Sequence, residues 1–194
     1  DFAFGSGDFT LECFMRFVAT TGTVGLVGQG AGAGSRAFFF YRGGSTLNFD
    51  YSTNGTATTA KSVSWTSTAN TWYHIALVRN GSNLLFFVDG AQVGATQDLA
   101  GATLYDSTTV FMMGDVPDIG EGPNAWFDEI RVSNTARWTA NFTAPASAYT
   151  CADANTKLLI HCDGTDASTT FTDDDTVCVV AAAAVSPHFL LMGV

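Results

Sequence analysis

Carboxylates with spacing suited to a metal ion occur in the loop sequence GDVPDIGEGPN. Asp115, Asp118 and Glu121 place three hard oxygen donors within seven residues, and oxygen donors of this kind are the ligands that Ca²⁺ takes in proteins. The loop is therefore the candidate metal site, with Ca²⁺ as the candidate ion. The alternative, a solvated acidic loop without metal, stays open and is the commoner case.

An acidic pair further along the chain, Asp128-Glu129, raises the question of glycoside hydrolysis, which requires two carboxylates facing one sugar bond. Adjacent side chains on a strand point to opposite faces, so the sequence predicts that these two cannot act together. It predicts an ion pair between Glu129 and Arg131, which share a face. It also predicts that Asp128, on the face of Ile130 and Val132, accepts hydrogen bonds from a neighbouring loop. No enzyme activity and no catalytic residue are expected.

Carbohydrate binding is the remaining site hypothesis. A sugar needs an aromatic side chain against its C–H face and planar polar groups for its hydroxyls, usually on loops at the rim of a sandwich. The candidate aromatics are Trp65, Tyr105 and Trp126, with Asn124 and Asp118 close to the last. Each of these aromatics is more often a core or edge residue than a ligand platform.

Histidines and cysteines, which often form catalytic or metal sites, show no such pattern here. His74, His161 and His188 have no triad spacing, and a strand histidine such as His74 is more often packed than catalytic. The four cysteines form no CxxC pair, which argues against zinc. Cys151 and Cys162 could form a disulfide, or both could be small buried thiols.

The charge balance excludes two classes of partner. A net charge of −10 with only eight Lys and Arg leaves no basic footprint for nucleic acid, and it argues against an anionic membrane surface. The apolar run Val177 to Val194 contains Ser186, Pro187 and His188. We therefore expect a packing or assembly segment and no membrane insertion. Without an initiator Met, the chain is expected to be processed or part of a longer one.

Strand patterns dominate the chain. Thr71 to Gly94 reads as a hairpin whose tight turn contains Asn80-Gly81, and Leu84 to Val88 is apolar on both faces, as in a buried strand. A single helical turn is predicted from Ser133 to Trp138. Other predicted strands are Phe9 to Val18, Thr23 to Gly28, Arg36 to Arg42, Thr46 to Thr53, Val63 to Trp65, Thr108 to Met113, Ala125 to Val132 and Lys157 to His161. Many short strands with almost no helix predict an all-β, antiparallel β-sandwich.

Three motifs, in order, resemble a known family. DFAFGSGDFTLECFMRF, WYHIALVRNGSNLLFFVDGAQVG and WFDEIRVSNTARW are similar to laminin-G-like domains of the concanavalin A-like lectin and glucanase type. The resemblance implies a jelly roll over residues 1–164, followed by an apolar tail at 165–194. The family's usual opening strand, LLxHxDG, lies near the end of this chain at Lys157 to Gly164. It either takes the opening strand's place or begins a next repeat.

A narrower resemblance concerns function. SNTARW, FTAPASAY and DANTKLLIHCDG are similar to repeats in tailed-phage structural proteins and some bacterial surface proteins. This implies a non-enzymatic virion structural protein, a capsid decoration or tail appendage on the virion surface. Its partners would be other virion proteins or copies of itself, and it could contact glycans. The alternative is a secreted or cell-surface lectin module, located outside the cell or on the bacterial surface. Both rest on analogy.

Overall fold

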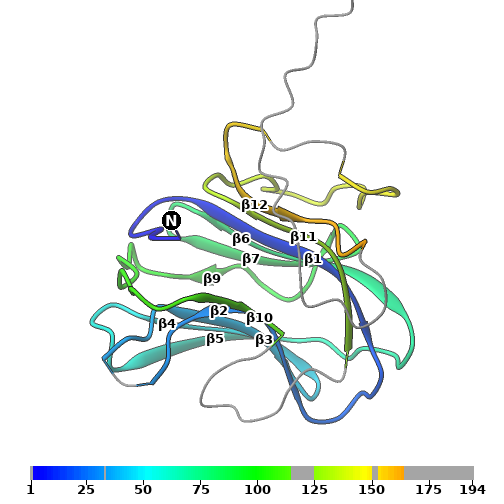
Figure 1. Ribbon diagram of the computed structural model, residues 1–194, viewed down its shortest axis with the longest axis horizontal. Coiled ribbons are helices and arrows are strands. Elements are labelled where there is room, and N and C mark those ends of the chain that lie inside the picture. The colour runs from blue at the N-terminus through cyan, green and yellow to red at the C-terminus, as the bar shows by residue number, and fades with distance from the viewer. Residues whose placement is uncertain (1, 33, 115–124, 150–152, 164–194) are drawn as a thin grey trace, which may run out of the picture.

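The computed structural model describes residues 2–32, 34–114, 125–149 and 153–163, which form two antiparallel sheets packed face to face (Figure 1). One sheet has seven strands in the order β12-β11-β1-β6-β7-β8, with β9 also paired to β7. The other has five, in the order β10-β2-β3-β4-β5. The described residues contain no helix, so the predicted all-β, antiparallel β-sandwich is confirmed.

The strand bounds follow the predicted segments closely, although β5 is longer and β10 is shorter than the sequence pattern indicated. The strands are β1 (Phe9–Phe17), β2 (Thr23–Gln29), β3 (Phe38–Gly43), β4 (Thr46–Ser52), β5 (Thr58–Ser64), β6 (Trp72–Asn80), β7 (Asn83–Val88), β8 (Ala91–Gln92), β9 (Gln97–Asp98), β10 (Phe111–Met113), β11 (Ala125–Ser133) and β12 (Thr156–Ile160).

The hydrophobic core fills the space between the two sheets. Alternate residues of β1 point into it, from Phe9 to Phe17, and all five are buried. Phenylalanines of β3 and β4 meet them from the other sheet, among them Phe38, Phe40 and Phe49. Burying each such side chain contributes about 1.5–3 kcal/mol relative to leaving it exposed. The odd-numbered residues of β1 therefore fix its even-numbered residues on the outer face.

The predicted hairpin is confirmed as β6 and β7, which pair from Ile75 with Val88 to Asn80 with Asn83. Gly81 adopts a φ of 61° in the turn between them. Residues 84–88 of β7 are all buried, as predicted for a strand covered on both faces.

Residues 134–149, which we call the strap, cover part of the outer face of the seven-stranded sheet (Figure 1). Trp138 and Phe142 stack on each other with ring centroids 4.0 Å apart. They pack on a second buried cluster on the outer face of β6 and β7, made of Ala76, Val78, Leu85 and Phe87. The strap explains why β7 is apolar on both faces.

The helical turn predicted from Ser133 to Trp138 is not formed. Ser133 ends β11, and its Oγ accepts a hydrogen bond from Arg137 Nε at 2.6 Å. The Arg137 backbone N–H donates to Thr10 Oγ1 at 3.0 Å. The groups that would have begun a helix are therefore used to attach the strap to the sheet.

The residues Leu158 to Ile160 of the LLIH segment lie in β12, which pairs antiparallel with β11 at the edge of the seven-stranded sheet, and His161 follows the strand. The thiol of Cys162, which follows this segment, is free, and Cys151 lies outside the described residues. The apolar run at 177–194 lies outside the described residues, and the domain division at residue 164 stays a prediction.

Candidate functional site

Two tryptophans and an arginine form a cross-strand row on the outer face of the seven-stranded sheet. Arg16 of β1 is paired in register with Trp72 of β6 on one side and with Trp126 of β11 on the other. Strands lie roughly 4.8 Å apart, so the two tryptophan Cα atoms are separated by about 10 Å. Trp72 is 44% exposed and Trp126 is 54% exposed. We call these three residues the Trp–Arg–Trp row.

The arginine of this row has few partners of its own. Its NH2 group donates to Asn70 Oδ1 over 3.4 Å, a long hydrogen bond. Its Nε is buried and has no hydrogen-bond partner. Arg16 makes no ion pair in the part of the chain that the structure describes. The row thus combines two exposed aromatic side chains with a guanidinium that has no ion-pair partner among the described residues.

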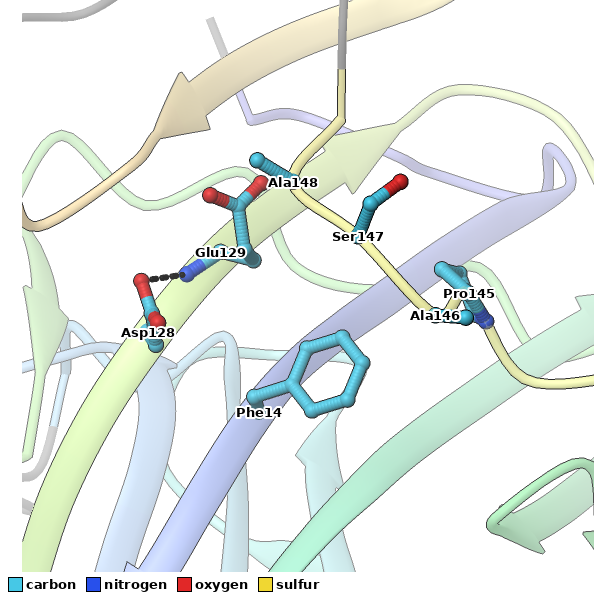
Figure 2. Close-up of a pocket in the computed structure, with 7 residues that line it drawn as sticks. All are labelled: Phe14, Asp128, Glu129, Pro145, Ala146, Ser147 and Ala148. Carbon is cyan, nitrogen blue, oxygen red and sulfur yellow. Dashed lines mark hydrogen bonds between the residues drawn. The ribbon is translucent and has the colours of Figure 1, made fainter.

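A pocket of about 350 Å³ adjoins the row. Phe14 and Asp128, which are paired in register, lie two residues along β1 and β11 from Arg16 and Trp126 and face the same side. Residues 145–148 of the strap form the opposite wall, as Figure 2 shows. Row and pocket therefore lie next to each other along β1 and β11 on the outer face of the sheet.

A β-bulge gives β11 one extra residue beside this pocket. The register shifts between Glu12 and Phe14 of β1, which pair with Arg131 and Asp128 respectively. Glu129 lies in the bulge with a φ of 49°. A bulge interrupts the alternation of side chains. As a result both Asp128 and Glu129 line the pocket, and the predicted opposite placement of the two carboxylates is wrong.

The two carboxylates have different partners from those predicted. Glu129 accepts hydrogen bonds from His161 Nδ1 at 2.8 Å and from the Tyr149 backbone N–H at 2.7 Å, and it makes no ion pair with Arg131. Asp128 Oδ1 accepts from the backbone N–H of Glu129 itself, at 2.9 Å, and no described loop residue donates to Asp128. Burial raises the pKa of Asp128, and the negative charge of Glu129 adds to the rise.

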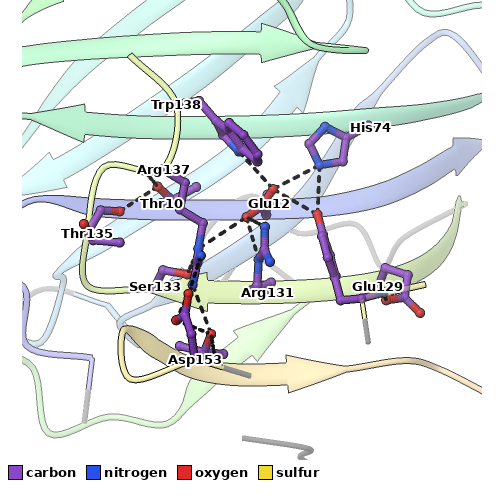
Figure 3. Close-up of polar contacts among 12 residues, drawn as sticks. Thr10, Glu12, His74, Glu129, Arg131, Ser133, Thr135, Arg137, Trp138 and Asp153 are labelled. Carbon is purple, nitrogen blue, oxygen red and sulfur yellow. Dashed lines mark hydrogen bonds and ion pairs between the residues drawn. The ribbon is translucent and has the colours of Figure 1, made fainter. Parts of the chain in front are cut away.

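The strap is attached to the outer face by a buried network centred on Glu12 (Figure 3). The Glu12 side chain is fully buried, and its carboxylate accepts from Arg131 Nε at 2.8 Å. His74 Nε2, Tyr149 OH and Trp138 Nε1 donate to its other oxygen at 3.1, 2.9 and 3.2 Å.

The environment of Glu12 holds it ionised. Burial alone would raise its pKa, but the hydrogen bond from His74 and the charge of Arg131 outweigh burial and lower the pKa to about 2. His74 is fully buried and packed, as predicted for a strand histidine. The network fixes the strap, and the strap forms one wall of the pocket.

The structure separates the predicted aromatics. Trp126 belongs to the row. Trp65 packs against the core, with its ring edge-on to Tyr73 at 5.0 Å, and Tyr105 is half-buried against Gly55. Neither joins the row. The predicted residues Asn124, Asp115, Asp118 and Glu121 lie outside the described residues, and so does the predicted Ca²⁺ site.

No cluster of three metal-ligating side chains occurs among the residues that the structure describes. The same residues include no helix long and apolar enough to cross a membrane. Trp72 and Arg16 were not among the predicted site residues, although the alternation of side chains along Phe9–Phe17 and Trp72–Asn80 places both on the outer face.

The fold and this surface define a lectin-like β-sandwich. The family profile of the concanavalin A-like lectin/glucanases superfamily, of laminin-G type, matches residues 1–141. The chain therefore belongs to this superfamily, and the resemblance noted from the three motifs is confirmed. No curated protein matches the chain.

Solved structures share the fold. A "putative carbohydrate binding protein" from Bacteroides ovatus superposes with a TM-score of 0.66 and 18% identity, over 87% of this chain and 50% of that chain. The binding domain of Botulinum neurotoxin serotype G gives a TM-score of 0.52 and 8% identity, over 69% of this chain and 34% of that one. The chain thus spans half or less of the length of these proteins.

Proposed function

We propose that the chain is a non-enzymatic recognition module that binds glycans over the Trp–Arg–Trp row. The observation that carries this proposal is the pair of exposed tryptophans on either side of Arg16. Indole rings offer flat apolar surfaces to the C–H faces of sugars, and the Arg16 guanidinium offers planar donors to their oxygens. The row is about as long as two sugar units, since two strand spacings of roughly 4.8 Å separate its ends.

The pocket extends this surface for a further sugar. Phe14 supplies an apolar wall, and the Asp128 carboxylate supplies an acceptor for hydroxyl groups. The lectin-like family supports the proposal. So does the fold shared with the Bacteroides protein, whose name refers to carbohydrate binding.

The test is glycan-array screening followed by calorimetry on the glycans that bind. We expect Trp72→Ala and Trp126→Ala each to weaken binding by about tenfold, which corresponds to about 1.4 kcal/mol. Val110→Ala is the matched control, because Val110 is 74% exposed beside the other sheet. Binding that survives the double tryptophan variant would contradict the proposal, as would the absence of any bound glycan.

We also propose that this module is part of a virion structural protein, a capsid decoration or tail appendage whose partners are other virion proteins or copies of itself. The motifs SNTARW, FTAPASAY and DANTKLLIHCDG support this role. Mass spectrometry of purified virions is the test, and we expect peptides of this chain in stoichiometric amounts. Recovery of the chain only from culture medium or cell surfaces would favour the alternative, a secreted or cell-surface lectin.

A further inference from the structure

Arg16 differs from four other arginines of this acidic chain in how its charge is used. Arg131 and Arg137 form ion pairs, with Glu12 at 2.7 Å and with Asp153 at 2.8 Å. The buried Arg42 and Arg79 donate to several backbone carbonyl oxygens. Arg16 has neither arrangement among the described residues, where its side chain donates a single long hydrogen bond to the Asn70 amide oxygen, 3.4 Å away.

The buried Nε of Arg16 strengthens this contrast. A buried donor without an acceptor costs free energy, and Nε has no partner in the part of the chain that the structure describes. A ligand arriving from solvent does not reach the buried Nε, but the two terminal nitrogens of a guanidinium also form a fork that binds a carboxylate through two parallel hydrogen bonds. The nearest pocket carboxylate, Asp128, does not fill this role, because no ion pair joins it to Arg16.

The flanking residues indicate what kind of anion fits. Trp72 and Trp126 lie on both sides of the guanidinium, so an anion reaching Arg16 lies between two apolar surfaces. Desolvation of this kind strengthens a charge-assisted hydrogen bond. A small free anion would leave both indoles in water. A sugar ring that carries a carboxylate would cover an indole and pair with the guanidinium at once.

We propose, resting on the glycan-binding function above, that the Trp–Arg–Trp row selects glycans that carry a carboxylate. The carboxylate binds the Arg16 fork, and the sugar rings on either side lie against Trp72 and Trp126. Uronic acids and sialic acids both supply this chemistry. The carboxylate is expected within or at the end of a chain of at least two sugars, because the row spans about two strand spacings.

The experiment compares matched ligands that differ in the carboxylate. The uronate arm uses tetragalacturonate and its carboxyl-reduced form, and the sialate arm uses sialyllactose and lactose. Titrations are run at about 0.15 M salt, so that the repulsion from the chain's net charge of −10 is screened. We expect the carboxylated ligand of at least one pair to bind about 10- to 100-fold more tightly than its neutral counterpart. The arm with the larger ratio identifies the source of the carboxylate.

Variants of Arg16 test its role in this preference. Arg16→Gln should remove the preference, while Arg16→Lys should keep only part of it because an ammonium is a point charge without a fork. Lys61→Gln, in β5 of the other sheet, is the matched control for loss of a positive charge and should keep the full preference. Circular dichroism and the melting temperature check that each variant is folded.

Two results would overturn the inference while leaving the proposed function intact. One is equal affinity for the carboxylated and neutral ligands of both pairs, with binding still lost in the double tryptophan variant. The other is a carboxylate preference that Arg16→Gln does not change. If the native chain binds no glycan of any kind, neutral or acidic, both the inference and the proposed function are wrong.

Discussion

A single carboxylate, Glu12, organises the outer face of the seven-stranded sheet. It is buried, it receives donors from β6, β11 and the strap, and it compensates the charge of Arg131. Removing one member of a buried ion pair leaves the other charge without compensation. Glu12 therefore stabilises the folded protein both through the hydrogen bonds that it accepts and by compensating the charge of Arg131.

We expect Glu12→Gln to lower the free energy of unfolding by about 3–5 kcal/mol, because the amide leaves the buried Arg131 charge uncompensated. Urea denaturation measures this change. The control is Asp153→Asn, which removes a carboxylate whose side chain is 54% exposed and which should cost no more than about 1 kcal/mol. A Glu12→Gln variant within about 1 kcal/mol of the native protein would show that the network does not hold the face together.

The sequence did not predict the contacts of individual residues such as Glu12. Glu12 lies in a strand whose outer face mixes polar residues with one phenylalanine, and nothing next to it in the sequence marks it as buried. Its partners Arg131 and Tyr149 are 119 and 137 residues away in the chain. A local pattern cannot contain such pairings, and this is also why the expected Glu129–Arg131 ion pair was wrong.

The strap is the element that converts a flat sheet face into a pocket. Its path depends on the turn after β7, where Gly90 has a φ of 79° and its position would bring any Cβ against the Phe142 carbonyl. The Phe142 N–H donates to the Gly90 carbonyl oxygen at 2.9 Å. A side chain at residue 90 would therefore push the strap away from the sheet.

Gly90→Ala should destabilise the protein more than Gly81→Ala does. Both glycines have positive φ, which costs a side chain about 1–2 kcal/mol, but Gly81 has open space around it. Gly90→Ala additionally collides with the backbone of Phe142, and we expect a further loss of about 1–3 kcal/mol. Thermal unfolding of both variants measures the difference, and limited proteolysis reports whether residues 134–149 become accessible. Equal stability of the two variants would contradict the role given to this turn.

Strands were predictable where one face is buried throughout, as in β1, β6 and β7, because the core imposes a strict period of two. The bulge in β11 was not predictable. Its extra residue exists only relative to the register of β1, and AWFDEIRV reads as a regular strand when considered alone. The sequence therefore predicted where the strand lies, but it did not predict that the bulge brings both Asp128 and Glu129 to the same pocket.

For the whole molecule, the sequence predicted the sandwich and its family because the core pattern repeats over many strands. It did not predict the candidate site. The row exists only where β6, β1 and β11 are aligned so that Trp72, Arg16 and Trp126 are in register. A surface that is assembled by sheet order needs the topology before it can be recognised, even though each of its residues was visible.

The stability of the whole molecule should fall in acid through Glu12. The pKa of this carboxyl is lowered from 4.5 to about 2 in the folded protein. Between these two values the unfolded chain binds a proton that the folded protein does not, so unfolding becomes easier as the pH falls. The Glu12 carboxylate contributes about 3 kcal/mol to the free energy of unfolding above about pH 5, and this contribution decreases between about pH 5 and pH 2. Asp153, whose pKa is lowered by the hydrogen bond from Arg137, acts in the same direction.

Urea denaturation at a series of pH values from about 2 to 7 measures this dependence, since its slope gives the difference in bound protons between the two states. Glu12→Gln lacks the titrating group and should show a shallower slope below pH 5, while Asp153→Asn should retain most of the native slope because its carboxylate is exposed and screened. If the free energy of unfolding falls equally in the native protein and in Glu12→Gln between pH 5 and 2, protonation of Glu12 is not the cause of the acid destabilisation.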